Sequence, residues 1–174
     1  MLADAVVRHY PYPAGWGANL ARVNRVARES GLDAAKQLWL ADPVFERSRE
    51  IPEVAARLRG MVEEYSGWQF LHDNPHRFLC SPAIERLAEV DVPTLVLVGE
   101  RDHSDSHGMA QLLAVGIPDA ELVTLPGTGH MSNMDSPDRF NEAVLAFLDH
   151  RPPGHEPGAA SAAGAPPPPP DRGS

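Results

Sequence analysis

Two side chains capable of acid–base chemistry follow two predicted strands. Thr94–Val98 is a continuous apolar run with β-branched residues, closed by Gly99, which is typical of a strand buried on both faces of a parallel sheet. Asp102 comes three positions after that glycine, and His130 comes five positions after a second predicted strand, Glu121–Leu125. Since the carboxyl ends of parallel strands lie at one edge of a sheet, the two side chains are expected to be neighbours. An aspartate beside a histidine is suited to orienting a general base.

Each residue also has a plainer interpretation. An aspartate after a strand is often only a turn residue, and a histidine between glycines is often a surface loop residue. A metal site is a further alternative, built from Asp102, His103, Asp105 and His107 or from the segment His72–His76. The first set lacks a third ligand in a recognisable context, and Pro75 would break a helical presentation of the second. We therefore favour the acid–base pair and predict neither a metal nor a cofactor.

The elements that position this pair form a strand–helix–strand–helix unit. A helix is predicted over Ser106–Val115, capped by Asp105 or Ser106, and a right-handed crossover then follows. Ser136 as the N-cap and Pro137 as the first helical residue open a last helix. Its predicted core side consists of Phe140, Val144, Phe147 and Leu148.

The region from Pro11 to Ala88 has helical periodicity throughout. One helix ends at Gly31, a second is capped by Asp33 and runs through Trp39, and the clearest spans Ile51–Tyr65. Four aromatic residues could either line a substrate pocket or form the core of this region, and we favour the core: Trp16, Trp39, Trp68 and Phe70.

Composition excludes several classes of protein. The 174 residues carry a formal net charge of −9, which argues against binding to a nucleic-acid backbone. No apolar run approaches the length of a membrane span, and the N-terminus does not resemble a signal peptide. One cysteine, Cys80, excludes an internal disulfide and is interpreted as a packing residue. We expect a cytoplasmic domain, followed by a disordered tail from Arg151 to Ser174 whose five-proline run could alternatively bind an SH3- or WW-like partner.

The sequence around the two candidate residues resembles the C-terminal half of α/β-hydrolase fold enzymes. The similar segments are Val92–Asp102, Gly127–Met131 and Ser136-Pro137. The resemblance implies an α/β fold with a helical cap followed by the C-terminal βαβα of a parallel sheet. The implied division is a truncated strand and entry to the cap (1–10), the cap (11–88), the C-terminal part of the core (89–150) and the tail (151–174).

In that family Asp102 and His130 match the acid and the base of the catalytic triad, whose serine lies in a G-x-S-x-G turn. No G-x-S-x-G occurs in this chain, and Ser66 and Ser81 lack that context. The resemblance therefore implies a fragment of an esterase-like hydrolase for a small apolar ester, lactone or related carbonyl compound, inactive by itself. Its expected partners are the small-molecule substrate, the upstream half of the same fold, and further copies through an open sheet edge. The alternative is a non-catalytic module that binds small ligands or other proteins.

Overall fold

A short parallel sheet organises the chain. The computed structural model describes residues 1–7, 9–11, 16–73 and 82–150. Its three strands are β1 (Leu2–Ala3), β2 (Thr94–Gly99) and β3 (Ala120–Leu125), in the order β1-β2-β3 and all parallel. The two predicted strands of the acid–base pair are confirmed to within one residue. The truncated strand expected within residues 1–10 is short, because only two of its residues pair with β2.

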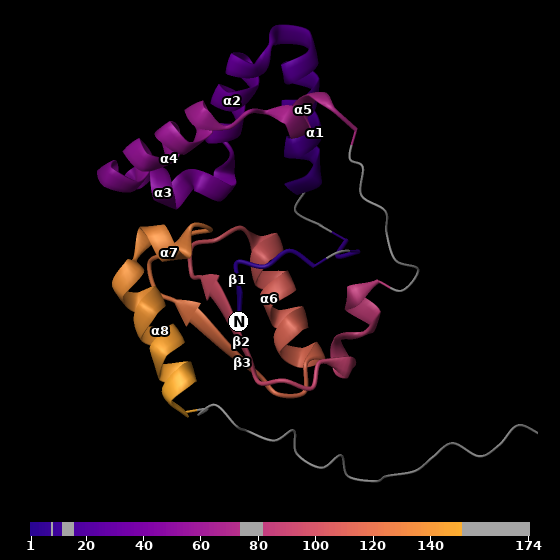
Figure 1. Ribbon diagram of the computed structural model, residues 1–174, viewed down its shortest axis with the longest axis vertical. Coiled ribbons are helices and arrows are strands. Elements are labelled where there is room, and N and C mark those ends of the chain that lie inside the picture. The colour runs from indigo at the N-terminus through magenta and orange to yellow at the C-terminus, as the bar shows by residue number, and fades with distance from the viewer. Residues whose placement is uncertain (8, 12–15, 74–81, 151–174) are drawn as a thin grey trace, which may run out of the picture.

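Helices cover both faces of this sheet (Figure 1). α6 (Ser104–Gly116) lies on one face and α8 (Pro137–His150) on the other. All six residues of β2 are buried, as predicted for a strand covered on both sides. Val96 and Val98 pack against Met109 and Leu113 of α6 in the main core cluster. β2 is thus a rigid support for the loop that carries Asp102.

A layer of helices lies beyond the carboxyl ends of the strands (Figure 1). Its elements are α1 (Trp16–Ser30), α2 (Leu32–Leu40), η1 (Pro43–Phe45), α3 (Glu46–Glu50), α4 (Pro52–Glu64) and α5 (Trp68–Leu71). Two short 3₁₀ helices, η2 (Ala83–Glu85) and η3 (Leu87–Glu89), lead back to the sheet, and α7 (Ser132–Asp135) follows β3. No helix among the described residues is long and apolar enough to cross a bilayer.

Aromatic side chains build the core of this helical layer. Trp39 has its ring centroid 5.4–5.7 Å from those of Phe45, Tyr65 and Phe70. Trp39 and Phe70 are therefore core residues, as predicted. Trp68 differs, because it is 48% exposed and its ring stacks on that of His72 instead. The side chain of Trp16 and the tail 151–174 lie outside the described residues.

Three details of the predicted helices are wrong. Asp33 lies in the first turn of α2, and Gly31 occupies the N-cap position with φ of 89°. His103, rather than Asp105 or Ser106, caps α6, because its Nδ1 accepts a hydrogen bond from the Asp105 amide at 3.2 Å. Leu148 is 55% exposed instead of lying in the core, since a three-stranded sheet covers only part of the apolar face of α8.

Candidate active site

The loop after β2 fixes Asp102 within one turn of the strand end. The Asp102 amide donates to the Gly99 carbonyl at 3.1 Å, which closes a tight turn. Oδ1 of Asp102 then accepts a hydrogen bond from the His103 amide at 2.6 Å. The side chain is fully buried and held by this bond, so its second oxygen, Oδ2, has a fixed position and can accept a further hydrogen bond. This is a short turn of the kind that aspartate favours after a strand.

The loop after β3 carries His130 and lies directly against the end of β2. Gly127 has φ of 69°, a conformation that favours glycine, and the Thr128 hydroxyl donates to the Leu125 carbonyl at 3.0 Å. A Cβ atom on Gly99 would lie 2.6 Å from the Thr128 carbonyl oxygen and would also collide with the carbonyl of Gly129. The glycine therefore allows the two loops to approach each other.

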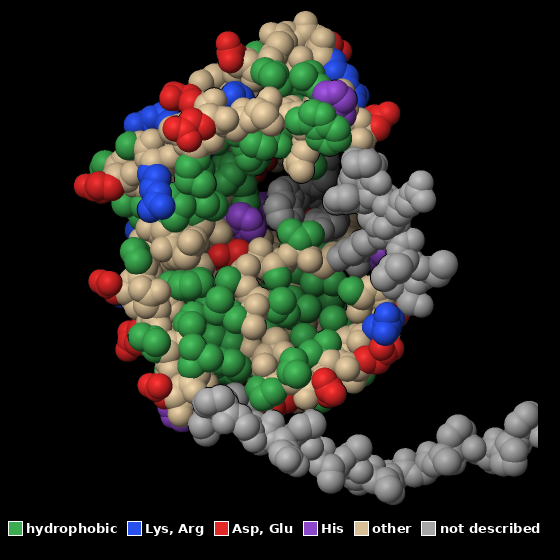
Figure 2. Space-filling model, viewed as in Figure 1, with side chains coloured by type: hydrophobic (Ala, Val, Ile, Leu, Met, Phe, Trp, Pro, Cys, Tyr) green, Lys and Arg blue, Asp and Glu red, His purple; other side chains and the backbone are tan. Residues whose placement is uncertain are grey.

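The two loops bring the predicted residues together. His130 Nδ1 lies 3.0 Å from Asp102 Oδ2, which is hydrogen-bond distance, so the two side chains are neighbours as predicted. Since a carboxylate only accepts, Nδ1 carries the proton and the basic lone pair is on Nε2. The imidazole is 17% exposed, and Figure 2 shows the surface hollowed between the helical layer and the sheet. This is the geometry of a general base oriented by an acid.

Electrostatic surroundings favour the protonated form of the imidazole. Burial lowers the pKa of His130, but the hydrogen bond and charge of Asp102, with the charges of Asp4 and Asp42, outweigh it, so the pKa of His130 is raised above its ordinary value. An imidazolium formed by proton abstraction is stabilised in such surroundings. That stabilisation is what a general base requires.

Asp4 and Ser132 complete the polar cluster, and sequence reasoning missed both. Asp4 directly follows β1, and its Oδ2 accepts a hydrogen bond from the buried Ser132 hydroxyl at 2.6 Å. The signal was available, because Asp4 lies at the carboxyl end of a parallel strand as Asp102 and His130 do. Ser132 gave no signal, because its contact spans 128 positions of sequence.

The short helix α3 contacts the loop of His130 from the helical layer. Arg47 Nε donates to the Gly127 carbonyl at 2.7 Å. Asp135 accepts from the Ser48 hydroxyl and from the Gly129 amide, each at 2.7 Å, and so joins α3 to the same loop. The loop is thus held from both layers of the molecule.

The same helix contacts the loop of Asp102. Arg101 donates to both carboxylate oxygens of Glu50, at 2.6 and 2.8 Å. These bonds, with the neighbouring Arg47, lower the pKa of Glu50 to about 2. Across the loops, the Glu100 carboxylate accepts from the Gly127 amide at 2.8 Å. None of these contacts was predicted from the sequence.

Other candidate residues do not join this cluster. Within the described ranges no three histidine, cysteine, aspartate or glutamate side chains are placed to hold a metal ion. His103 serves as a helix cap, and Ser66 is exposed on the turn before α5. Cys80, Ser81 and the segment from Asn74 to His76 lie outside the described residues.

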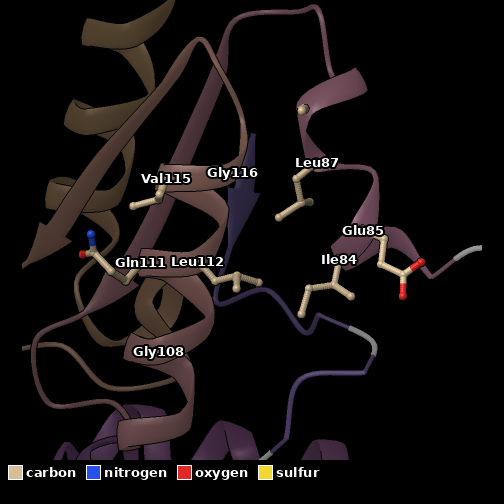
Figure 3. Close-up of a pocket in the computed structure, with 9 residues that line it drawn as sticks. Ile84, Glu85, Leu87, Gly108, Gln111, Leu112, Val115 and Gly116 are labelled. Carbon is tan, nitrogen blue, oxygen red and sulfur yellow. The ribbon is translucent and has the colours of Figure 1, made fainter.

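A separate cavity of about 550 Å³ lies between η2, η3 and α6 (Figure 3). Its walls include Ile84, Leu87 and Leu112, and they include neither Asp102 nor His130. Val115 at its rim is 76% exposed, so the cavity is an open apolar groove. It is not part of the acid–base site.

Comparison with known proteins gives concordant similarities. A family model described as "Alpha/beta hydrolase family" matches residues 2–143. "Putative carbamate hydrolase RutD" of Azorhizobium caulinodans is 33% identical over 128 residues, which cover 71% of this chain and 47% of that protein.

Two solved structures share the architecture. MenH from S. aureus superposes with a TM-score of 0.63 and 23% identity, over 75% of this chain and 50% of that one. Est816, described as an N-acyl homoserine lactone degrading enzyme, superposes with a TM-score of 0.56 and 27% identity, over 75% of this chain and 54% of that one. The chain thus spans about half the length of the proteins it matches.

Proposed function

Because the chain belongs to the alpha/beta hydrolase family, we propose that Asp102 and His130 are the acid and the base of a hydrolytic site. The observation that carries this proposal is the 3.0 Å hydrogen bond between them, at the carboxyl ends of two adjacent strands. Nε2 of His130 takes the proton of a nucleophile and later activates water, while Asp102 holds the tautomer and stabilises the imidazolium.

The substrate class we propose is a small, largely apolar ester, lactone or related carbonyl compound. Similarity to proteins named for carbamate hydrolysis and for lactone degradation supports cleavage at an acyl carbon. The helical layer supplies apolar walls near the loops, since Met131, next to His130, packs against the cluster of Val44, Phe45, Leu58 and Val62. Apolar walls with few polar groups are typical of small-molecule sites.

No G-x-S-x-G occurs within these 174 residues. We therefore further propose that the nucleophile and the oxyanion donors come from a segment outside them. Without them His130 offers only general-base assistance to water, typically 10²–10⁴-fold over background. The chain by itself then hydrolyses no ester at an enzymatic rate.

The test compares the chain alone with the chain co-expressed with the part of the carbamate hydrolase relative that it does not match. A short-chain aryl ester is the substrate, and His130→Ala and Asp102→Asn are the variants. We expect saturable turnover only in the combined protein and its loss in His130→Ala. Turnover by the chain alone would overturn the proposed division of the site, and turnover unaffected by His130→Ala would overturn the assignment of the base.

The free edge of β1 is the proposed contact for that second segment. β1 pairs only with β2 among the described strands, so its other edge presents unpaired backbone groups. Figure 2 shows apolar side chains gathered on the sheet-bearing part of the molecule, and Val6, three residues after β1, is 61% exposed. Alone, the chain is expected to associate through this edge, which size-exclusion chromatography would detect. A thermally stable monomer would contradict this expectation.

A further inference from the structure

Asp4 lies directly after β1 in the left-handed backbone conformation, which is uncommon for residues other than glycine. Its amide continues the pairing of β1 with β2 by donating to the Leu97 carbonyl at 3.0 Å, and its φ is +46°. Its Oδ2 accepts from Ser132, two residues beyond His130. Its Oδ1 is buried and has no hydrogen-bond partner among the described residues.

We propose that Asp4 is a positioning residue of the hydrolytic site, which holds the loop of His130 through Ser132 and places a second negative charge near the imidazole. The inference rests on the proposed function, since it assigns Asp4 a role toward the proposed base. Three strand ends thus contribute to one cluster: Asp4 from β1, Asp102 from β2 and His130 from β3. Asp102 accepts the hydrogen bond of the imidazole, whereas Asp4 is joined to the loop of His130 through Ser132 and acts on the imidazole through its charge.

The charges of Asp4 and His130 influence each other's protonation. Burial raises the pKa of Asp4 from its ordinary value of 3.8 to about 6; the Ser132 hydrogen bond and His130 lower it, and the charge of Asp102 raises it. On His130 the acting charges are those of Asp102, Asp4 and Asp42. Asp42 has a separate structural role, since its Oδ1 accepts a hydrogen bond from the Val44 amide and caps η1.

The coupling makes the basicity of His130 depend on the state of Asp4. Below about pH 6 the Asp4 carboxyl is neutral and contributes no charge, whereas above that pH it is ionised and favours the imidazolium. An imidazole that is more basic at neutral pH takes a proton from a nucleophile more readily. Loss of the charge should therefore lower the pKa of His130 without breaking its bond to Asp102.

The experiment is an NMR titration of the His130 imidazole in the full chain, with the resonance assigned by His130→Ala. Asp4→Asn keeps the size of the side chain and an acceptor for Ser132 but removes the charge. Asp4→Glu keeps the charge. We expect the pKa of His130 to fall by roughly 0.5–1 unit in Asp4→Asn and to stay within about 0.2 unit of wild type in Asp4→Glu.

Two further readouts keep the inference falsifiable even where Asp4→Asn folds poorly. In the wild type, the titration curve of His130 should be broader than that of one independent site, because two coupled groups titrate together. Ser132→Ala should raise amide exchange in residues 128–131. An unchanged pKa in Asp4→Asn, or a single-site curve in the wild type, would overturn the role of the charge, and unchanged exchange would overturn the role of Ser132. These readouts need no turnover, so failure of the combined protein to hydrolyse the ester would refute the proposed function separately.

Discussion

Replacement of Asp4 by asparagine should stabilise the protein in a pH-dependent way. Asp4 is ionised at neutral pH although its surroundings favour the neutral form, since burial raises its pKa from 3.8 to about 6. At about 1.4 kcal/mol per pKa unit, this difference costs the folded state at most about 3 kcal/mol once both pKa values are exceeded. Asparagine keeps the shape and avoids the buried charge.

The sign follows from the bound proton. A carboxyl with a raised pKa binds its proton more tightly in the folded state, so its contribution to stability is present below pH 3.8 and is lost as the pH rises through 6. The linkage relation gives a cost of about 1 kcal/mol at pH 4.5 and about 3 kcal/mol at pH 8.5. The gain from Asp4→Asn should thus increase by about 2 kcal/mol between these pH values.

Urea denaturation of both proteins at pH 4.5, 6 and 8.5 measures this difference. Asp91→Asn, which removes one negative charge from an exposed position, is the matched control and should show no such trend. A stability difference independent of pH, or an Asp4→Asn variant less stable than wild type at pH 8.5, would refute the reasoning. In either case the buried carboxyl would be better satisfied than its unpartnered Oδ1 indicates.

Two further substitutions test how the loops are held. Gly99→Ala should lower the free energy of unfolding in urea by about 1–3 kcal/mol and displace the loop of His130, since its Cβ would meet the backbone of that loop. Gly60→Ala, on α4 with open space around its Cβ, is the control and should raise the free energy of unfolding by about 0.5–1 kcal/mol. Equal effects would contradict the close approach of Gly99 to the loop of His130. Glu50→Gln should lower the protection of the amides of residues 100–103 against hydrogen exchange several-fold, because it weakens the bidentate contact to Arg101. The wild type should keep that contact down to about pH 3, because the pKa of Glu50 is about 2. Unchanged protection in the variant would show that the contact does not hold the loop.

The part of the site that could be predicted is the part set by local sequence. Thr94–Val98 is apolar without alternation because it is buried on both faces, and Asp102 and His130 follow their strands within a few residues. Parallel pairing of adjacent strands then brings them together, so their contact at 3.0 Å needed no long-range information.

The contacts that could not be predicted join distant parts of the chain. Arg47 and Glu50 lie in a five-residue helix with no motif, and their partners are loops of the other layer. His103 replaced the expected caps because its ring nitrogen reaches the Asp105 amide, a less common use of histidine. Leu148 has the spacing of a core residue, but how much of α8 the sheet covers depends on the number of strands.

The tautomer of His130 tests the central claim most directly, because a general base oriented by Asp102 requires its proton on Nδ1. Nitrogen-15 chemical shifts of the imidazole in the neutral form distinguish the two tautomers. We predict protonated Nδ1 and unprotonated Nε2 in the wild type, with the preference lost and the pKa lowered in Asp102→Asn. A proton on Nε2 in the wild type, or shifts and pKa unchanged in Asp102→Asn, would contradict the assignment of His130 as the base.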